Sequence, residues 1–436
     1  MTNEQKAFLY TGQPEYDIPR NVTHVKVDSS VKMIGEWAFL ICSQLSIVEL
    51  REGLDVIGKV AFHCCTSLER ITIPSSVRVV GGRAFEGCTQ LKIVKLCEGL
   101  ERIDDSAFHS CTSLQRITIP STVKVIGEWA FRCCTRLKFF EICEGLERID
   151  AWAFDNCTSL QRITIPSTVK VIGEYAYRCC TQLKIVKLCE GLDRIDNSAF
   201  ENCPSLERIT IPSTVKVIGE WAFHGCTQLK IVEICEGLER IDAWAFDKCT
   251  SLQRITIPST VKVIDKYAYR CCTQLKIVKL CEGLDRIDHS AFENCPSLEI
   301  INIPSTVKVI DKYAFCSCTG WDAIEFSNET EKFLMDVSLR KWLVDDATYY
   351  ELPQRYSLLA RRSFPKRLCM IELTTGKMRI RDLLTRIPSI ASQDLDVHVD
   401  SIDTELDTYE ELQKCIDASL ENCNLGFIIP QVLSFL

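Results

Sequence analysis

The 26 cysteines are the most reactive side chains of this sequence, because a thiolate is both a nucleophile and a metal ligand. Thirteen of them recur at every twenty-third position, and further cysteines, such as Cys64 and Cys133, directly precede members of this series without forming C-x-x-C pairs. A zinc site needs four converging ligands, whereas an evenly spaced series forms a line, so we predict no metal and no cofactor. We call the series the cysteine ladder, and its members are Cys42, Cys65, Cys88, Cys111, Cys134, Cys157, Cys180, Cys203, Cys226, Cys249, Cys272, Cys295 and Cys318.

A cysteine nucleophile would need a histidine beside it. His63, His109 and His224 lie one or two residues from a cysteine, but each lies in a different repeat, and we interpret this scatter as surface drift. Neighbouring ladder cysteines would lie about 4.8 Å apart at Cα, which a disulfide tolerates, but their parallel side chains disfavour the bond. G-x-G-x-x-G, Walker A, H-E-x-x-H and G-x-S-x-G motifs are absent from the sequence. We therefore predict buried, reduced thiols without an evident hydrogen-bond partner, and no enzyme.

The cysteines belong to a repeated unit that is twenty-three positions long. The segment Ile-Pro-Ser-Thr-Val-Lys-Val-Ile returns every 46 residues from Ile119 to Ile303, and Cys-Glu-Gly-Leu marks a half-copy between each pair. Each unit ends in a hexad of the type Leu-x-x-Phe/Ile-x-Ile. Its positions one, four and six point inward and positions two, three and five point outward, as in a half-buried strand. One coil cannot bury its own apolar side, so the units must stack.

Three regions follow from this repeat. Residues 1–27 are predicted to form an N-terminal cap with a half-coil, and residues 28–326 a solenoid, mostly β with turns, of 13 coils with this period of 23. Residues 327–436 are predicted to form a mainly α-helical C-terminal cap or small domain. Its basic block, 355–386, either pairs with the acidic block, 394–421, or docks an acidic partner.

The pattern Ile-Pro-x-x-Val-x-x-Ile-Gly-x-x-Ala-Phe-x-x-Cys-x-x-Leu resembles the BspA-like leucine-rich repeats, over about two thirds of the chain. The resemblance implies a right-handed leucine-rich repeat solenoid that serves protein interaction or adhesion. It also implies that the repeats have no enzymatic activity.

Charge and composition limit the partners. With 51 basic and 59 acidic residues the chain has a net charge of -8, so no overall basic charge draws it to nucleic acid or an anionic membrane. Charged residues interrupt every apolar stretch before it could span a bilayer. Residues 1–18 lack the apolar core of a signal peptide, and we therefore expect a cytoplasmic protein.

The outward hexad positions are where a function of the repeats would lie. The third position carries arginines that alternate with aliphatic or aromatic residues, a combination typical of interfaces. The alternative is a solvated face whose cross-strand pairs serve register and solubility. We call the outward side of the hexads the strand face, and its candidate partner-binding residues are Arg70, Ile93, Arg116, Phe139, Arg162, Ile185, Arg208, Ile231, Arg254 and Ile277.

A second surface lies at the tenth position of the unit. We call it the aromatic ridge, and it either packs against the adjacent coil or stacks on a sugar or partner. Our prediction is a non-enzymatic scaffold that binds an unknown protein or peptide through the strand face. The alternatives are an adhesin or carbohydrate-binding surface protein and an enzyme whose active part lies in the C-terminal segment. The ridge consists of Trp37, Trp129, Trp152, Tyr175, Trp221, Trp244, Tyr267 and Tyr313.

Overall fold

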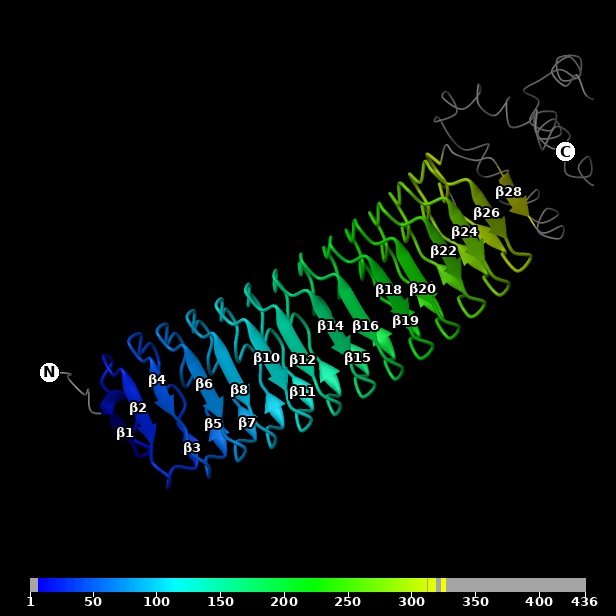
Figure 1. Ribbon diagram of the computed structural model, residues 1–436. Coiled ribbons are helices and arrows are strands. Elements are labelled where there is room, and N and C mark those ends of the chain that lie inside the picture. The colour runs from blue at the N-terminus through cyan, green and yellow to red at the C-terminus, as the bar shows by residue number, and fades with distance from the viewer. Residues whose placement is uncertain (1–6, 312, 319–322, 327–436) are drawn as a thin grey trace, which may run out of the picture. The chain divides into compact units, whose positions relative to one another are not determined.

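The structure is a computed structural model, and it describes residues 7–311, 313–318 and 323–326. Within these ranges the chain winds into a β-solenoid in which each turn contributes one long and one short strand (Figure 1). The described residues contain a single helical element, the 3₁₀ helix η1 (Glu15–Asp17). The helices predicted for residues 327–436 lie outside the described residues.

The long strands form the strand face. A three-stranded parallel sheet, β1-β2-β4, is followed by a twelve-stranded sheet from β6 to β28. The strands are β1 (Phe8–Tyr10), β2 (His24–Val27), β4 (Ile47–Glu49), β6 (Arg70–Ile73), β8 (Ile93–Leu96), β10 (Arg116–Ile119), β12 (Phe139–Ile142), β14 (Arg162–Ile165), β16 (Ile185–Leu188), β18 (Arg208–Ile211), β20 (Ile231–Ile234), β22 (Arg254–Ile257), β24 (Ile277–Leu280), β26 (Ile300–Ile303) and β28 (Ala323–Phe326).

The short strands form a second parallel sheet of thirteen strands. Each begins at the twenty-third position after the start of its predecessor, which confirms the repeat length read from the sequence. The strands are β3 (Met33–Ile34), β5 (Val56–Ile57), β7 (Val79–Val80), β9 (Arg102–Ile103), β11 (Val125–Ile126), β13 (Arg148–Ile149), β15 (Val171–Ile172), β17 (Arg194–Ile195), β19 (Val217–Ile218), β21 (Arg240–Ile241), β23 (Val263–Ile264), β25 (Arg286–Ile287) and β27 (Val309–Ile310).

Two successive units form one hydrogen-bonded module, and this module corresponds to the 46-residue period of the sequence. Strand β10 pairs with β12 over four residue pairs, whereas β12 pairs with β14 through Phe139 and Arg162 alone. At the junction between this module and the preceding one, where β8 and β10 share a single residue pair, Glu98 accepts hydrogen bonds from the backbone N–H and the hydroxyl of Ser121. Gly99, in the turn after β8, has φ +112°, and a Cβ there would lie 2.0 Å from the carbonyl oxygen of Ser75, in the turn after β6 of the same module. The Cys-Glu-Gly-Leu turn therefore requires glycine.

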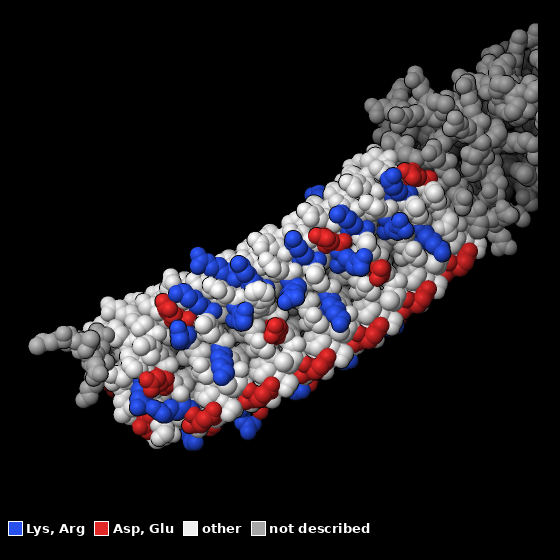
Figure 2. Space-filling view, in the orientation of Figure 1, with Lys and Arg blue, Asp and Glu red and all other residues white. Residues whose placement is uncertain are grey.

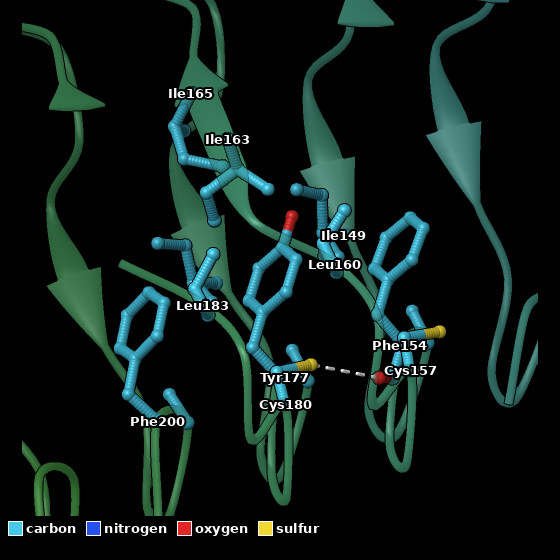
Figure 3. Packing of buried hydrophobic residues seen from close by; sticks show 14 of the residues in the cluster. Ile149, Phe154, Cys157, Leu160, Ile163, Ile165, Tyr177, Cys180, Leu183 and Phe200 are labelled. Carbon is cyan, nitrogen blue, oxygen red and sulfur yellow. Dashed lines mark hydrogen bonds between the residues drawn. The ribbon is translucent and has the colours of Figure 1, made fainter. Parts of the chain in front are cut away.

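The core is a column of aromatic rings, one from each turn, that runs along the solenoid from Phe39 to Phe315. Successive ring centroids lie 5.0–5.5 Å apart and the rings are nearly parallel. Figure 3 shows Phe154, Tyr177 and Phe200 of this column beside Leu160 and Leu183. Because every ring covers its neighbour, each turn buries the apolar side of the next.

The ladder cysteines lie beside this column, and their thiols form hydrogen bonds that the sequence did not reveal. The thiol of Cys157 donates to the carbonyl oxygen of Phe131 at 3.2 Å, and the thiol of Cys180 to that of Phe154 at 3.3 Å (Figure 3). Both cysteines are fully buried. Burial raises the pKa of Cys226, a member of the same ladder, to about 12, so its thiol is protonated at neutral pH. A protonated, buried thiol is neither a nucleophile nor a metal ligand.

Two tyrosines interrupt the phenylalanine column and carry a stability cost. Tyr177 is fully buried, and among the described residues its hydroxyl has no hydrogen-bond partner. Tyr269, four turns later, has the same environment. We expect Tyr177→Phe to raise the free energy of unfolding by about 1–3 kcal/mol, because it removes an unsatisfied polar group and keeps the ring. Thermal unfolding would check this, with Tyr175→Phe on the half-buried ridge as the matched control; a lower midpoint for Tyr177→Phe would mean that the hydroxyl is bonded after all.

Candidate interaction surface

The third hexad position forms a column on the strand face. In the parallel register Arg116 lies opposite Phe139 on one side and Ile93 on the other, so equivalent residues of successive turns are neighbours. Nine of the ten candidate residues are exposed, and Ile231 is half-buried. Ile185 has 60% of its surface exposed, a large fraction for an isoleucine. The column therefore offers cations and apolar side chains in alternate turns to whatever covers it.

The five arginines of this column differ from most others in the protein. None of them forms an ion pair with a carboxylate of the described residues; Arg116 instead lies over the ring of Phe139, 5.3 Å from its centroid. Elsewhere in the described ranges arginines generally lie beside an acid, so the strand face holds cations whose charge no carboxylate of the described residues compensates. The arginines that do form ion pairs are Arg51, Arg78, Arg83, Arg102, Arg132, Arg148, Arg178, Arg194, Arg240, Arg270 and Arg286.

The neighbouring outward positions add to this positive charge. Between β4 and β26 the second, third and fifth hexad positions hold thirteen cations and six carboxylates, although the whole chain has a net charge of -8. Figure 2 shows Lys and Arg gathered over the long strands, and Asp and Glu along the rim formed by the turns that follow those strands. Two of the six carboxylates, Glu141 and Glu233, accept hydrogen bonds from Thr118 and Thr210. The strand face is thus a basic surface on an acidic protein.

The sheet is open between β4 and β6. No residue pair joins these two strands, although both neighbouring pairs, β2–β4 and β6–β8, are hydrogen-bonded. A cavity of about 700 Å³ lies over the opening, lined by Ile47, Glu49, Arg51 and Arg70 among others. The opening adjoins the strand face, since Ile47, Glu49, Arg70 and other outward hexad residues line it together with the inward Val48, Leu50 and Ile71.

Five of the eight residues of the aromatic ridge stack on one another, whereas Trp37 is exposed. The rings of Trp221 and Trp244 stack at 4.9 Å and those of Trp244 and Tyr267 at 5.0 Å, while Trp152 and Tyr175 stack at 4.0 Å. These residues adopt positive φ angles, and their backbone N–H groups donate to carbonyl oxygens of the following turn. Because the ring faces cover one another, little of them is left for a sugar to stack on. The structure favours the packing interpretation of the ridge.

A family model described as BspA type leucine rich repeat region (6 copies) matches residues 16–136, 101–218 and 193–322. These ranges cover more than half of the chain. The chain belongs to the BspA-type leucine-rich repeat family. Its repeats share their type with proteins that are generally surface or interaction proteins without enzymatic activity.

The more similar of two solved structures has the same type of repeat. A leucine-rich repeat protein from Bacteroides ovatus ATCC 8483 is 29% identical, with a TM-score of 0.58 over 71% of this BspA-type chain and 84% of that chain. A leucine rich cell surface protein from Faecalibacterium prausnitzii A2-165 is 26% identical, with a TM-score of 0.38 over 75% of this chain and 92% of that one. No curated protein matches the chain.

The thirteenth position of the BspA-type unit holds a column of charges that sequence reasoning missed. The fully buried Asp155 accepts hydrogen bonds at 2.9 Å from Nε of both Arg132 and Arg178, which lie in the turns before and after it. The three histidines near cysteines belong to the same column. His63 and His109 face one carboxylate, Glu86, from opposite sides.

The surface-drift interpretation of the histidines was therefore wrong. His224 lies 3.0 Å from the buried Asp247, whose other side is held by Arg270. Burial alone would raise the pKa of Asp247, but the hydrogen bonds from His224 and Arg270 outweigh it and lower that pKa. Folding lowers this pKa, so the carboxylate adds stability above its unfolded pKa, and that stability is lost as the pH falls through the folded value. From His63 to Glu293 the thirteenth position alternates between an acid and a histidine or arginine, except that Arg132 follows His109.

In the part of the chain that the structure describes, no three His, Cys, Asp or Glu side chains come together in a group that could hold a metal ion. No helix of the described ranges is long and apolar enough to cross a membrane.

Proposed function

We propose that this chain is a non-enzymatic interaction scaffold that binds a protein or peptide through the strand face. The observation that carries the proposal is the column of five arginines that have no ion-pair partner among the described residues, interleaved with exposed aliphatic residues. Desolvated arginines and apolar anchors are what interface centres enrich. The six carboxylates on the same face interrupt the positive surface, which favours a protein over nucleic acid as the partner.

The test is capture by a charge-reversed variant. Arg116, Arg162 and Arg208 changed together to Glu should lower the capture of partners by the immobilised full chain at least tenfold, because interface arginines are often worth about 2 kcal/mol or more each. The thermal midpoint should stay unchanged, since these side chains point away from the core. Captured proteins would be quantified by mass spectrometry.

The matched control reverses three arginines of the short strands, Arg148, Arg194 and Arg240, and should keep the capture. Unchanged capture by the strand-face variant, together with loss of capture on deletion of residues 327–436, would contradict the proposal and place the binding site in the C-terminal segment.

We also propose that the protein works in the cytoplasm. Its 23 cysteines in the described ranges are free thiols, and several, such as Cys64 and Cys133, are only partly buried. Free thiols persist in a reducing compartment and are oxidised outside it. Cell fractionation would test the proposal, and recovery of the chain from the outer surface of the cell would contradict it.

A further inference from the structure

We propose that the partner presents an acidic amphipathic α-helix that lies along the solenoid, with acidic and apolar side chains on alternate turns. The inference rests on the proposed function, because it describes what the strand face binds. It follows from the spacing, the charge and the exposure of one column of residues.

The spacing of the column matches an α-helix. Successive units stack at 5.0–5.5 Å, as the core rings show, and the pitch of an α-helix is about 5.4 Å. Arginines recur every second unit from Arg70 to Arg254. Residues seven apart in a helix lie on one face about 10.5 Å apart, so an acid at every seventh position would meet one arginine after another.

The residues between the arginines determine where the partner helix would carry apolar side chains. Ile93, Phe139, Ile185 and Ile277 are exposed, and each lies one unit from an arginine. A helical residue three or four positions after an acid lies about one turn further on the same face. Apolar residues at these positions would cover the isoleucines and Phe139, and each would bury area that now faces water.

Extended partners fit the column less well. In a β-strand successive side chains point to opposite faces, so residues three apart, which span about 10 Å, face opposite ways. Polyproline II brings every third residue to one face, but only about 9.3 Å apart, and the mismatch would grow over the five arginines. An α-helix keeps the axial spacing of the column, at about 10.5 Å for every seven residues.

The charge of the face selects an acidic helix. Thirteen cations face six carboxylates, and the five arginines have no acid of the described chain beside them. Glu141 and Glu233, two carboxylates beside the column, are each held by a threonine hydroxyl of the adjacent strand. A helix that carries acids every seventh residue would supply the missing counter-charges.

The experiment measures the binding of synthetic peptides to the full chain by fluorescence anisotropy at 150 mM salt. One peptide of four heptads has Glu at every seventh position and Leu midway between the glutamates. A second peptide has the same composition and helix content, but its Glu and Leu residues recur every five positions. We expect the heptad peptide to bind at least tenfold more tightly. Arg162→Gln with Arg208→Gln should weaken that binding at least tenfold, and Arg148→Gln with Arg194→Gln should leave it unchanged.

Each other outcome overturns the inference in a distinct way. Equal binding of the two peptides would mean attraction without helical register. Tighter binding of an oligonucleotide of equal charge would show that the partner is a nucleic acid. Dimerisation of the chain, if the Arg162/Arg208 variant abolishes it, would show that the partner is a second copy. No binding of either peptide, while the charge-reversed variant still loses capture, would refute the helix and leave the proposed function standing. Retained capture by that variant would refute the proposed function itself.

Discussion

Replacing Phe154 by alanine should lower the free energy of unfolding by about 3–5 kcal/mol. The ring is fully buried, and its centroid lies 5.2 Å from that of Phe131, 5.1 Å from that of Tyr177 and 4.3 Å from that of Phe140. Alanine would leave a cavity in the middle of the column. Neighbouring turns interact only with each other, so the cavity also weakens the coupling between the two halves of the solenoid.

Urea unfolding followed by circular dichroism would measure both effects. We expect a lower midpoint and a broader or divided transition, because the halves can then unfold separately. Phe139→Ala is the matched control: it removes the same ring from the exposed strand face and should cost less than about 1 kcal/mol, mainly the contact with Arg116. Similar losses for the two variants would show that the column is not the main source of stability.

The sequence was sufficient to predict the solenoid because every unit repeats the same pattern. Once the period is known, the inward positions follow from the residue types, and Phe154 and Cys157 are buried as their positions imply. The outward exposure of Arg162 and Ile185 follows from the alternation of the same hexads. These are properties of single positions in the unit.

Contacts between units were harder to predict. Ion pairs at the thirteenth position join residues of successive units, so Asp155 and Arg178 look unrelated along the chain and become partners only when the units are aligned. The pairing of strands in twos depends on small differences between alternate turns, and these differences cannot be predicted from any single residue type. Likewise, the hydroxyl of Tyr177 has no hydrogen-bond partner among the described residues because apolar side chains surround it, and the thiol of Cys157 has one because a carbonyl of the preceding turn faces it. Periodicity fixes positions, whereas pairs of positions require the structure.

Replacing Asp155 by alanine should cost about 3 kcal/mol, although the residue lies outside the apolar core. Its carboxylate is completely buried and accepts hydrogen bonds at 2.9 Å from Arg132, Arg178 and Asn156. Without it, two guanidinium groups from neighbouring turns would face each other with no counter-charge. Both arginines remain partly exposed, with 36% and 26% of their side chains accessible, so water recovers some of the loss and keeps the cost at the lower end for buried ion pairs.

Thermal and urea unfolding would compare this variant with Asp150→Ala, which removes an acid from a surface pair with Arg148 and should cost less than about 1 kcal/mol. A third variant separates two causes of the loss. Asp155→Leu combined with Arg132→Met and Arg178→Met removes the acid and both arginines and fills the space with apolar side chains. If the penalty of Asp155→Ala comes from uncompensated charge, the triple variant should recover most of the lost stability, because apolar side chains can replace buried ion pairs at little cost. If the triple variant is no more stable than Asp155→Ala, the attraction within the cluster itself stabilises the stack, and the alternation of charges at the thirteenth position is a main source of cohesion between turns.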